Sequence, residues 1–315
     1  MNPAPTQQPL IVIVGPTGSG KSQLAIEIAG RCKGEVVNYD SVQLYRGFEI
    51  GAAKVPVNER RGIPHHLFDV AGPGHDYTAG EYSREARLTL ADICSRGMVP
   101  VLCGGTGFYL RALLCGLSPA STRDERVRDR LQAIATRRPS SLHFVLSRLD
   151  PAAARQIHPN DQQKLIRALE MAHLERQKTS DIQRRPRDSL TGYRVLKLGL
   201  DPDRQLMYDA LNIRSNALFS QGLLKETSKL LAEGYSANSK PMQSLGYRQA
   251  VLALAGTISL EQAMEECRTK TRQYAKRQRT WFRTEMEVNW FKGFGSDPQI
   301  QEQAQLLVVE FLSHR

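Results

Sequence analysis

The stretch LIVIVGPTGSGKSQLAIEIA, residues 10–29, constrains the fold of this chain more than any other. An apolar run typical of a buried strand is followed by a glycine-rich turn and then by apolar residues at helical spacing. Gly15, Gly20, Lys21 and Ser22 fit G-x-x-x-x-G-K-[ST], in which backbone N–H groups, the lysine and the hydroxyl surround a di- or triphosphate. The sequence therefore predicts a phosphate-binding α/β domain.

The following segments continue to alternate between strand and helix. EVVNY is strand-like, and TAGE at 78–81 is a capping box that starts a helix running to about Arg96. VPVLC at 99–103 is typical of a buried strand, GGTG of a tight turn and FYLRALLC of a helix. Because such alternation forms parallel sheets with crossover connections, we expect the α/β class, with a doubly wound parallel sheet like that of P-loop NTPases.

The sequence changes character between residues 117 and 191, where it becomes Arg-rich, polar and helical. We interpret 117–191 as a helical insertion in a core formed by 1–116 and 192–315. YRVLKLGL at 193–200 returns to the core as a strand. Asp201 could then cap a long amphipathic segment that is interrupted at Gly222 and ends at Gly234.

Charge and composition narrow the class of protein. The net charge is +11, from 43 Lys and Arg against 32 Asp and Glu, and such an excess attracts polyanions, so nucleic acid is the first partner to test. No apolar run approaches the ~20 residues of a membrane span. The N-terminal MNPAPTQQP lacks the features of a secretory signal, so we expect a cytoplasmic protein. Five cysteines without a C-x-x-C pair argue against a disulfide framework and a cysteine zinc site.

An ordinary ATPase or GTPase would have a magnesium-binding aspartate at the end of a second apolar strand. Here the strand at 99–103 ends in GGTG instead, which indicates chemistry other than routine hydrolysis. Asp40 follows EVVNY at the sheet edge where α/β proteins bind ligands. Its carboxylate could assist Mg²⁺, accept a proton from a nucleophile, or cap a turn, and the pattern leaves these alternatives open. The adjacent His65 and His66 would point to opposite sides, which favours structural or substrate-lining roles over a shared metal.

The segment RTKTRQYAKRQRTWFR, residues 268–283, carries many cations and no carboxylate. On a helix, five of the cations fall within an arc of about 80°, and apolar residues share a separate face. We call these five the cationic stripe: Arg268, Arg272, Lys276, Arg279 and Arg283. Like charges three or four residues apart repel by about 0.2–0.5 kcal/mol per pair, so a polyanion partner is favoured over a solvated face.

A series of motifs in this order closely resembles the tRNA dimethylallyltransferase (tRNA isopentenyltransferase) family over nearly the whole chain. The motifs are GPTGSGKS, DSVQLYRGFEIGAAK, IPHHLFDV, YTAGEYSREA, GGTGFYLRALLCGL, IHPNDQQKLIRALE, QSLGYRQA and TRQYAKRQRTWFR. The resemblance implies transfer of a dimethylallyl group from dimethylallyl diphosphate to the exocyclic N6 amine of the adenine 3′-adjacent to the anticodon in tRNA. It is to the bacterial form, because QLLVVEFLSHR carries no Cys-x-Cys-His pattern of the kind found in some eukaryotic members.

The resemblance also implies roles for individual residues. Asp40 would be the base, Thr17 and Arg214 would contact the leaving diphosphate, and Thr106 would lie near the target base. For Arg214 a simple helix-surface charge remains an alternative. Ser22 would hold Mg²⁺, the expected cofactor. The diphosphate would be bound by Gly15, Pro16, Thr17, Gly18, Ser19, Gly20, Lys21 and Ser22.

The implied partner is the anticodon stem-loop of tRNA, from which the adenine must unstack at a cost of a few kcal/mol. We expect the protein to act as a monomer. The implied tRNA contacts are Asp40, Ser41, Val42, Gln43, Thr106, Arg128, Gln163, Lys164, Leu165, Ile166, Arg167, Gln243, Ser244, Leu245, Gly246, Tyr247, Arg248, Lys276, Arg277, Gln278, Arg279, Thr280, Trp281, Phe282 and Arg283.

Two other functions are compatible with the motifs taken one by one. A small-molecule kinase would use Lys21 and Asp40 but would leave the cationic stripe without a role. An RNA-binding protein switched by a nucleoside triphosphate would use both, and its RNA affinity would survive Asp40→Ala. Phosphoryl transfer without tRNA would indicate the first, and nucleotide-dependent RNA binding without a modified product would indicate the second.

Overall fold

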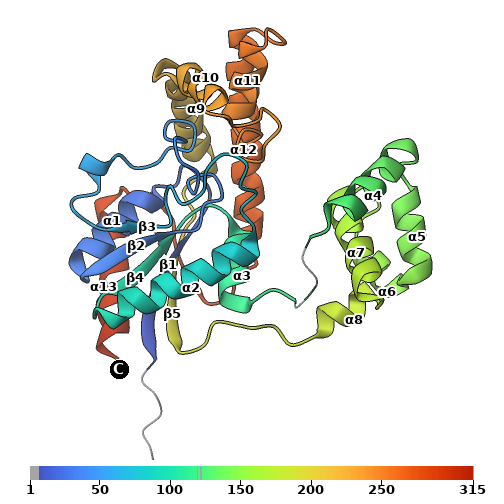
Figure 1. Cartoon of the computed structure of the whole chain (residues 1–315). Helices are drawn as coiled ribbons and strands as arrows, with labels where there is room; N and C mark the ends of the chain where they lie inside the picture. Colours follow the sequence, from blue (N-terminus) through green and yellow to red (C-terminus); the bar gives the residue numbers. More distant parts are fainter. Residues whose placement is uncertain (1–6, 119, 121–122, 315) are drawn as a thin grey trace, which may run out of the picture. The chain divides into compact units, whose positions relative to one another are not determined.

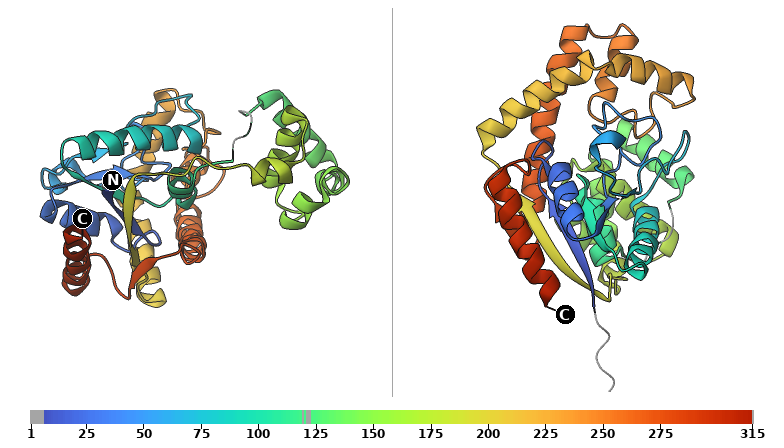
Figure 2. Two further views of the ribbon diagram at one scale, coloured as in Figure 1. Left: turned by 90° about the horizontal axis from the view of Figure 1, so that it is seen from below. Right: turned by 90° about the vertical axis from the view of Figure 1, so that its left-hand side faces the viewer.

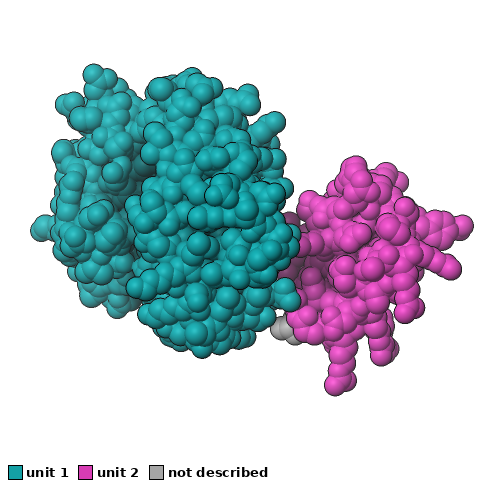
Figure 3. Space-filling view, turned by 90° about the horizontal axis from the view of Figure 1, so that it is seen from above, with its two compact units in different colours: residues 1–114, 190–315 teal, residues 115–189 magenta. Residues whose placement is uncertain are grey.

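The computed structural model describes residues 7–118, 120 and 123–314 of the chain (Figure 1). It divides into two compact units, one formed by 1–114 together with 190–315 and the other by 115–189 (Figure 3). The expected limits of the insertion, 117 and 191, lie close to this division. In the described part of the chain, no helix has both the length and the apolar character needed to cross a membrane.

The first unit is built on a sheet whose described strands are all parallel, in the order β3-β2-β4-β1-β5-β6. The expected parallel α/β sheet is therefore confirmed. Because parallel strands end at a common edge, the loops that follow them gather there. The strands are β1 (Gln8–Val14), β2 (Gly34–Asn38), β3 (His65–His66), β4 (Val99–Cys103), β5 (Tyr193–Leu200) and β6 (Val288–Phe291).

Strand β1 is buried on both faces, as a central parallel strand must be. Leu10, Val12 and Val14 belong to one hydrophobic core with α2 and α3, whereas Ile11 and Ile13 belong to a second core with α1 and α13. Figure 2 shows α2 and α13 on opposite sides of the sheet. These helices are α1 (Lys21–Arg31), α2 (Ala79–Ser95), α3 (Gly107–Cys115) and α13 (Pro298–Ser313).

Four further helices of the first unit pack on one another. The expected break and end of the amphipathic segment are confirmed at Gly222 and Gly234, where φ is +106° and +96°. The expected cap is wrong. The helix α9 begins at Arg204, so Asp203 caps it by accepting from the N–H groups of Gln205 and Leu206, and Asp201 pairs with Arg279 instead. These helices are α9 (Arg204–Ser220), α10 (Leu223–Ala232), α11 (Tyr247–Leu254) and α12 (Leu260–Phe282), and a 3-10 turn, η1, spans Val57–Glu59.

The second unit is helical, as expected for the insertion, and has a core of its own that includes Leu142, Leu146 and Leu169. Glu170 is fully buried in it and pairs with Arg128 and with Arg167. A buried carboxylate needs such partners to remain charged. The helices are α4 (Glu125–Arg137), α5 (Ser141–Leu149), α6 (Pro151–Gln156), α7 (Gln162–Glu175) and α8 (Thr179–Arg184).

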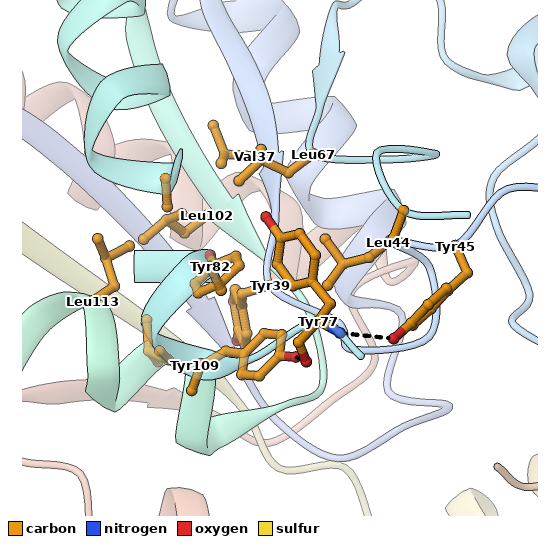
Figure 4. Close-up of a cluster of buried hydrophobic side chains, with 14 of the residues drawn as sticks. Val37, Tyr39, Leu44, Tyr45, Leu67, Tyr77, Tyr82, Leu102, Tyr109 and Leu113 are labelled. Carbon is orange, nitrogen blue, oxygen red and sulfur yellow. Dashed lines mark hydrogen bonds between the residues drawn. The ribbon is translucent and has the colours of Figure 1, made fainter. Parts of the chain in front are cut away.

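A cluster of buried tyrosines fixes the chain at the end of β2 (Figure 4). The hydroxyl of Tyr39 donates to the carbonyl of Ile13 at 2.5 Å, just before the phosphate-binding turn. Tyr109 donates to the carbonyl of Tyr77 at 3.1 Å, and the N–H of Tyr77 donates to the hydroxyl of Tyr45 at 3.2 Å. Each buried hydroxyl used in this way holds two distant segments in register. The residue after Tyr39 is thereby held close to the end of β1.

Candidate active site

The turn between β1 and α1 has the backbone that its glycines predict. Gly15, Gly18 and Gly20 all have φ between +79° and +145°, a region that favours glycine. A Cβ on Gly15 would lie 2.7 Å from the carbonyl oxygen of Leu200, so the turn packs directly against β5. The N-terminus of α1 therefore faces the common edge of the sheet, where its free N–H groups can bind an anion.

Lys21 begins α1 and is buried, and its Nζ donates to the carbonyl of Pro16 at 2.8 Å. Burial lowers the pKa of Lys21 to about 8, and the guanidinium of Arg214 acts in the same direction, while Asp40 opposes it. Burial destabilises the charged form of Lys21. A phosphate bound nearby would stabilise that form again by supplying a negative charge.

Cys103 ends β4, where an ordinary ATPase would place its magnesium-binding aspartate. Burial raises the pKa of the Cys103 thiol to about 11, so it remains neutral near pH 7. The cysteines are free thiols, as expected.

Two cavities open at the common edge of the sheet in the described part of the chain. The first, of about 410 Å³, is lined by the phosphate-binding turn, including Gly20, Lys21 and Ser22. The second, of about 360 Å³, is lined by Gln243, Ser244 and Leu245, which precede α11, and by residues of α9 and α12. The same side chains form a wall of both cavities, so the cavities meet there. They are Thr17, Asp40, Ala52, Arg214 and Tyr274.

Asp40 uses its two carboxylate oxygens differently. Oδ1 accepts from the N–H of Val42 at 2.9 Å and from that of Gln43 at 3.4 Å, so it caps a turn. Oδ2 lies 2.9 Å from where a Cβ on Gly105 would be, beside the cavities. Gly105 must therefore be glycine for Oδ2 to remain accessible. The sequence left turn cap and proton acceptor as alternatives, and the geometry allows both at once.

Thr106 is placed differently from Asp40 although the two are close in space. Its hydroxyl accepts from the N–H of Ser41 at 2.9 Å and donates to the hydroxyl of Ser41 at 3.1 Å. It is not part of the wall of either cavity. Thr106 therefore holds the turn that follows Asp40. Within that turn Gln43 lines the first cavity, and its Nε2 donates to the carbonyl of Ala52 at 3.0 Å.

The adjacent histidines have separate surroundings, as expected for an extended segment. His65 lines the first cavity, and its Nδ1 is bonded to the carbonyl of Ile63 at 2.8 Å. His66 is bonded to the buried carboxylate of Glu35 at 2.6 Å. His65 therefore forms part of a cavity wall, whereas His66 connects β3 to β2 through its bond to Glu35.

The segments expected to contact tRNA contain both exposed and buried side chains. The buried ones pack within the two units and cannot reach a macromolecule at the surface without unfolding. They are Leu165, Ile166, Tyr247, Gln278 and Phe282. The exposed ones, which remain available, are Gln163, Lys164, Gln243, Arg248, Lys276, Arg277, Thr280 and Arg283.

Four members of the cationic stripe lie on α12 and Arg283 is the C-cap of this helix, but the argument from unrelieved repulsion is wrong. Arg279 pairs with Asp201 at 2.6 Å, Arg283 pairs with the same carboxylate, and Arg268 pairs with Glu265. Burial alone would raise the pKa of Asp201, but the bonds from Lys292, Arg279 and Arg283 lower it below its usual value. Asp201, which lies far from α12 in the sequence, and Glu265, which lies in the first half of the same helix, therefore offset much of the repulsion.

Two polar residues of α12 reach the site: Tyr274 was not among the predicted site residues, and Gln278 was predicted only as a tRNA contact. Tyr274 forms a wall of both cavities, and burial raises its pKa well above the usual range, so its hydroxyl stays protonated. Gln278 is buried and bonded to the phosphate-binding turn. A signal existed, because at about 100° per residue both lie in the middle of the apolar face of this helix, where polar side chains need partners.

Comparison with known proteins shows the relationship of this chain to others. The model of the IPP transferase family matches residues 43–285. The chain belongs to this family. It is 52% identical to the tRNA dimethylallyltransferase of Solibacter usitatus, over 96% of this chain and 99% of the relative. It is 50% identical to the tRNA dimethylallyltransferase of Koribacter versatilis, over 95% and 97%.

Solved structures of the family have the same fold. The tRNA isopentenylpyrophosphate transferase of Bacillus halodurans is 34% identical, with a TM-score of 0.73 over 98% of this chain and 97% of that one. A eukaryotic dimethylallyltransferase acting on tRNA is 28% identical, with a TM-score of 0.84 over 98% and 80%. The resemblance of the sequence motifs to this family is therefore confirmed over nearly the whole chain.

Proposed function

We propose that this protein transfers the dimethylallyl group of dimethylallyl diphosphate to the N6 amine of the adenine 3′-adjacent to the anticodon of tRNA, giving N6-isopentenyladenosine and diphosphate. The observation that carries the proposal is the meeting of two cavities at Thr17, Asp40 and Arg214. One cavity contains the phosphate-binding turn and suits the donor. The other cavity also reaches the carboxylate of Asp40 and suits the adenine. The names of the relatives agree with this activity.

The donor would react as its carbon–oxygen bond breaks and the electron pair stays with the diphosphate. Lys21, Arg214 and the N–H groups at the start of α1 would stabilise the negative charge that grows on the leaving group. The N6 amine of adenine forms the new bond to the freed carbon. Its proton would pass to Oδ2 of Asp40, the oxygen that the turn leaves free.

Magnesium is the proposed cofactor, and the donor atoms present fit it only with help from the substrate. Ser22 offers a hydroxyl in the first cavity. Among the described residues, no group of three or more His, Cys, Asp and Glu side chains could hold a metal ion. Mg²⁺ is commonly held by few protein groups together with phosphate oxygens and water. When bound, it would neutralise part of the charge of the diphosphate.

The anticodon stem-loop of tRNA is the proposed acceptor. The adenine has to leave its stack, and contacts to the RNA backbone offset that cost. Exposed cations that could make such contacts occur in both units, among them Lys164, Arg248, Lys276 and Arg277. Because its proposed substrate is tRNA, we propose that the protein is located in the cytoplasm. We propose that the protein acts as a monomer.

The decisive experiment is mass spectrometry of an unmodified tRNA after incubation with the protein, Mg²⁺ and dimethylallyl diphosphate. We expect a gain of one C5H8 unit, located at the adenine next to the anticodon. A transcript whose mass stays unchanged at saturating donor and metal would overturn the proposal. Incubation with labelled ATP and small acceptors tests the kinase alternative in parallel, since phosphoryl transfer without tRNA would support it.

A further inference from the structure

The side chain of Gln278 joins three segments that are far apart in the sequence. Its Oε1 accepts from the backbone N–H of Thr17 at 2.7 Å, across 261 residues. Its Nε2 donates to the carbonyl of Gly105 at 2.7 Å, across 173 residues. The turn after β1, the turn after β4 and helix α12 therefore meet at one amide group.

The two partners fix the orientation of this amide. A backbone N–H can only donate and a carbonyl can only accept, so only one orientation of the Gln278 amide satisfies both. The side chain is only 5% exposed, so water cannot easily replace either bond. Removing the amide would take away the acceptor of the partly buried Thr17 N–H and would leave the Gly105 carbonyl with only the 3.5 Å bond from the Tyr274 hydroxyl, which is more costly than losing an exposed hydrogen bond.

Both partners of Gln278 are next to the groups proposed to react. Thr17 is part of the wall of both cavities. A Cβ on Gly105 would lie 2.7 Å from Nε2 of Gln278 and 2.9 Å from Oδ2 of Asp40. The amide therefore sets the spacing between the turn that would hold the leaving group and the turn beside the proposed base.

The same helix presents cations on its outer side. Lys276 and Arg277 directly precede Gln278 in the sequence and are exposed. Arg277 also lines the second cavity. An RNA bound to these side chains would restrain α12, and through Gln278 it would restrain Thr17.

We propose that Gln278 is a positioning residue that couples RNA binding on α12 to diphosphate binding in the first cavity. The inference rests on the proposed function, which supplies the two ligands. It assigns to Gln278 a role through Thr17 and Gly105 and no contact with the reacting atoms. Coupling of this kind is reciprocal, so each ligand should raise the affinity of the other by the same factor.

The test compares Gln278→Met, which has a similar length and no amide, with Gln273→Met, a matched control at an exposed glutamine of the same helix. The affinity of inorganic pyrophosphate is measured with and without an anticodon stem-loop RNA. In the wild type and the control, the RNA should raise pyrophosphate affinity several-fold. In Gln278→Met the factor should fall towards one, and the KM for dimethylallyl diphosphate should rise about tenfold, the size expected when a partly buried N–H loses its acceptor.

A second variant, Gln278→Glu, keeps the size and the acceptor for Thr17 but sets a carboxylate oxygen against the carbonyl of Gly105. It should weaken donor binding at least as much as Gln278→Met, and thermal unfolding shows whether each variant is folded. A wild-type coupling factor of one, or folded variants with wild-type KM and coupling, would overturn the proposal. Because pyrophosphate binding needs no turnover, an inactive wild type would count against the proposed function alone.

Discussion

At the scale of single residues, Asp40 shows how one carboxylate can serve both structure and chemistry. Oδ1 is bound by the N–H groups of Val42 and Gln43 and holds the turn. Oδ2 is left beside the cavities, where a proton acceptor would be useful. A substitution that keeps one oxygen in place and removes the charge can therefore separate the two tasks.

Asp40→Asn should make this separation. The amide oxygen can still accept from Val42, so the midpoint of thermal unfolding and the affinity for tRNA should change little. The turnover number for prenyl transfer should fall about 100- to 10,000-fold, the contribution typical of a general base. Single-turnover kinetics with saturating tRNA and donor would measure it. Prenyl transfer by Asp40→Asn at the wild-type rate would show that Asp40 is not the base.

Lys21 should make donor binding dependent on pH. Its pKa is about 8 in the folded protein, against 10.5 for an ordinary lysine, so its charge in the empty site is lost as the pH rises through about 8. The KM for dimethylallyl diphosphate should therefore rise above pH 8, by up to about tenfold per pH unit. The effect on stability has the opposite sign. Because the pKa of Lys21 is about 8 in the folded chain and 10.5 for an ordinary lysine, its contribution to the free energy of unfolding is lowest below pH 8 and highest above pH 10.5. Kinetics between pH 7 and pH 9.5 would test the first effect.

Lys21→Arg is the control for that pH dependence. A guanidinium stays charged over this range, so the variant should bind the donor with a KM that does not rise above pH 8. The same rise in both proteins would show that another group is titrating.

The proposed Mg²⁺ ligand is the hydroxyl of Ser22, so both metal removal and loss of this hydroxyl should slow prenyl transfer. Chelation should stop transfer, and added Mg²⁺ should restore it. Ser22→Ala should need about tenfold more Mg²⁺ for half-maximal rate, a change equivalent to about 1.4 kcal/mol for the lost ligand. A magnesium titration of the transfer rate would measure this. An unchanged requirement would mean that the hydroxyl is not a ligand.

At the scale of elements, α12 combines side chains with different tasks on one helix. Arg279 is tied to the buried carboxylate of Asp201, whereas Lys276 is exposed. Lys276→Gln should reduce the slope of log affinity for tRNA against log salt by about 0.7–0.9 and leave stability unchanged. Arg279→Gln should instead lower the free energy of unfolding by about 2 kcal/mol. Filter binding at several salt concentrations and thermal unfolding would distinguish the two, and equal effects of both changes would contradict this division.

The elements were predictable where local signals agree. The strand before Gly15, the capping box at Thr78 and the break at Gly222 each depend on nearby residues, and all three are confirmed. The roles of Asp201 and Gln278 were not predictable, because their partners lie far away in the sequence. A polar residue on an apolar helix face indicates that a partner exists but not which one.

At the scale of the whole molecule, the motifs predicted the family because their order along the chain is specific, and the alternation of strand and helix patterns predicted the parallel sheet. They did not predict which members of each motif face the cavities. Tyr247 and Phe282 belong to motifs expected to bind tRNA, yet both are fully buried. A motif records all the residues that a site needs, including those that only support it.

The proposal that the protein acts as a monomer can be tested in solution. Sedimentation should give a single species near 35.3 kDa, with or without donor, and activity per chain should not depend on protein concentration. Activity that falls on dilution would indicate that a second copy contributes.

The backbone N–H of Gly295 donates to the carbonyl of Ser19 at 2.8 Å, after β6 has joined the sheet beside β5. The ribosome thus makes the phosphate-binding turn well before it makes the segment that secures this turn. During synthesis, a nascent chain would carry the turn without the neighbour that completes it. The ability to bind the prenyl donor should accordingly arise only after β6 and Gly295 have emerged.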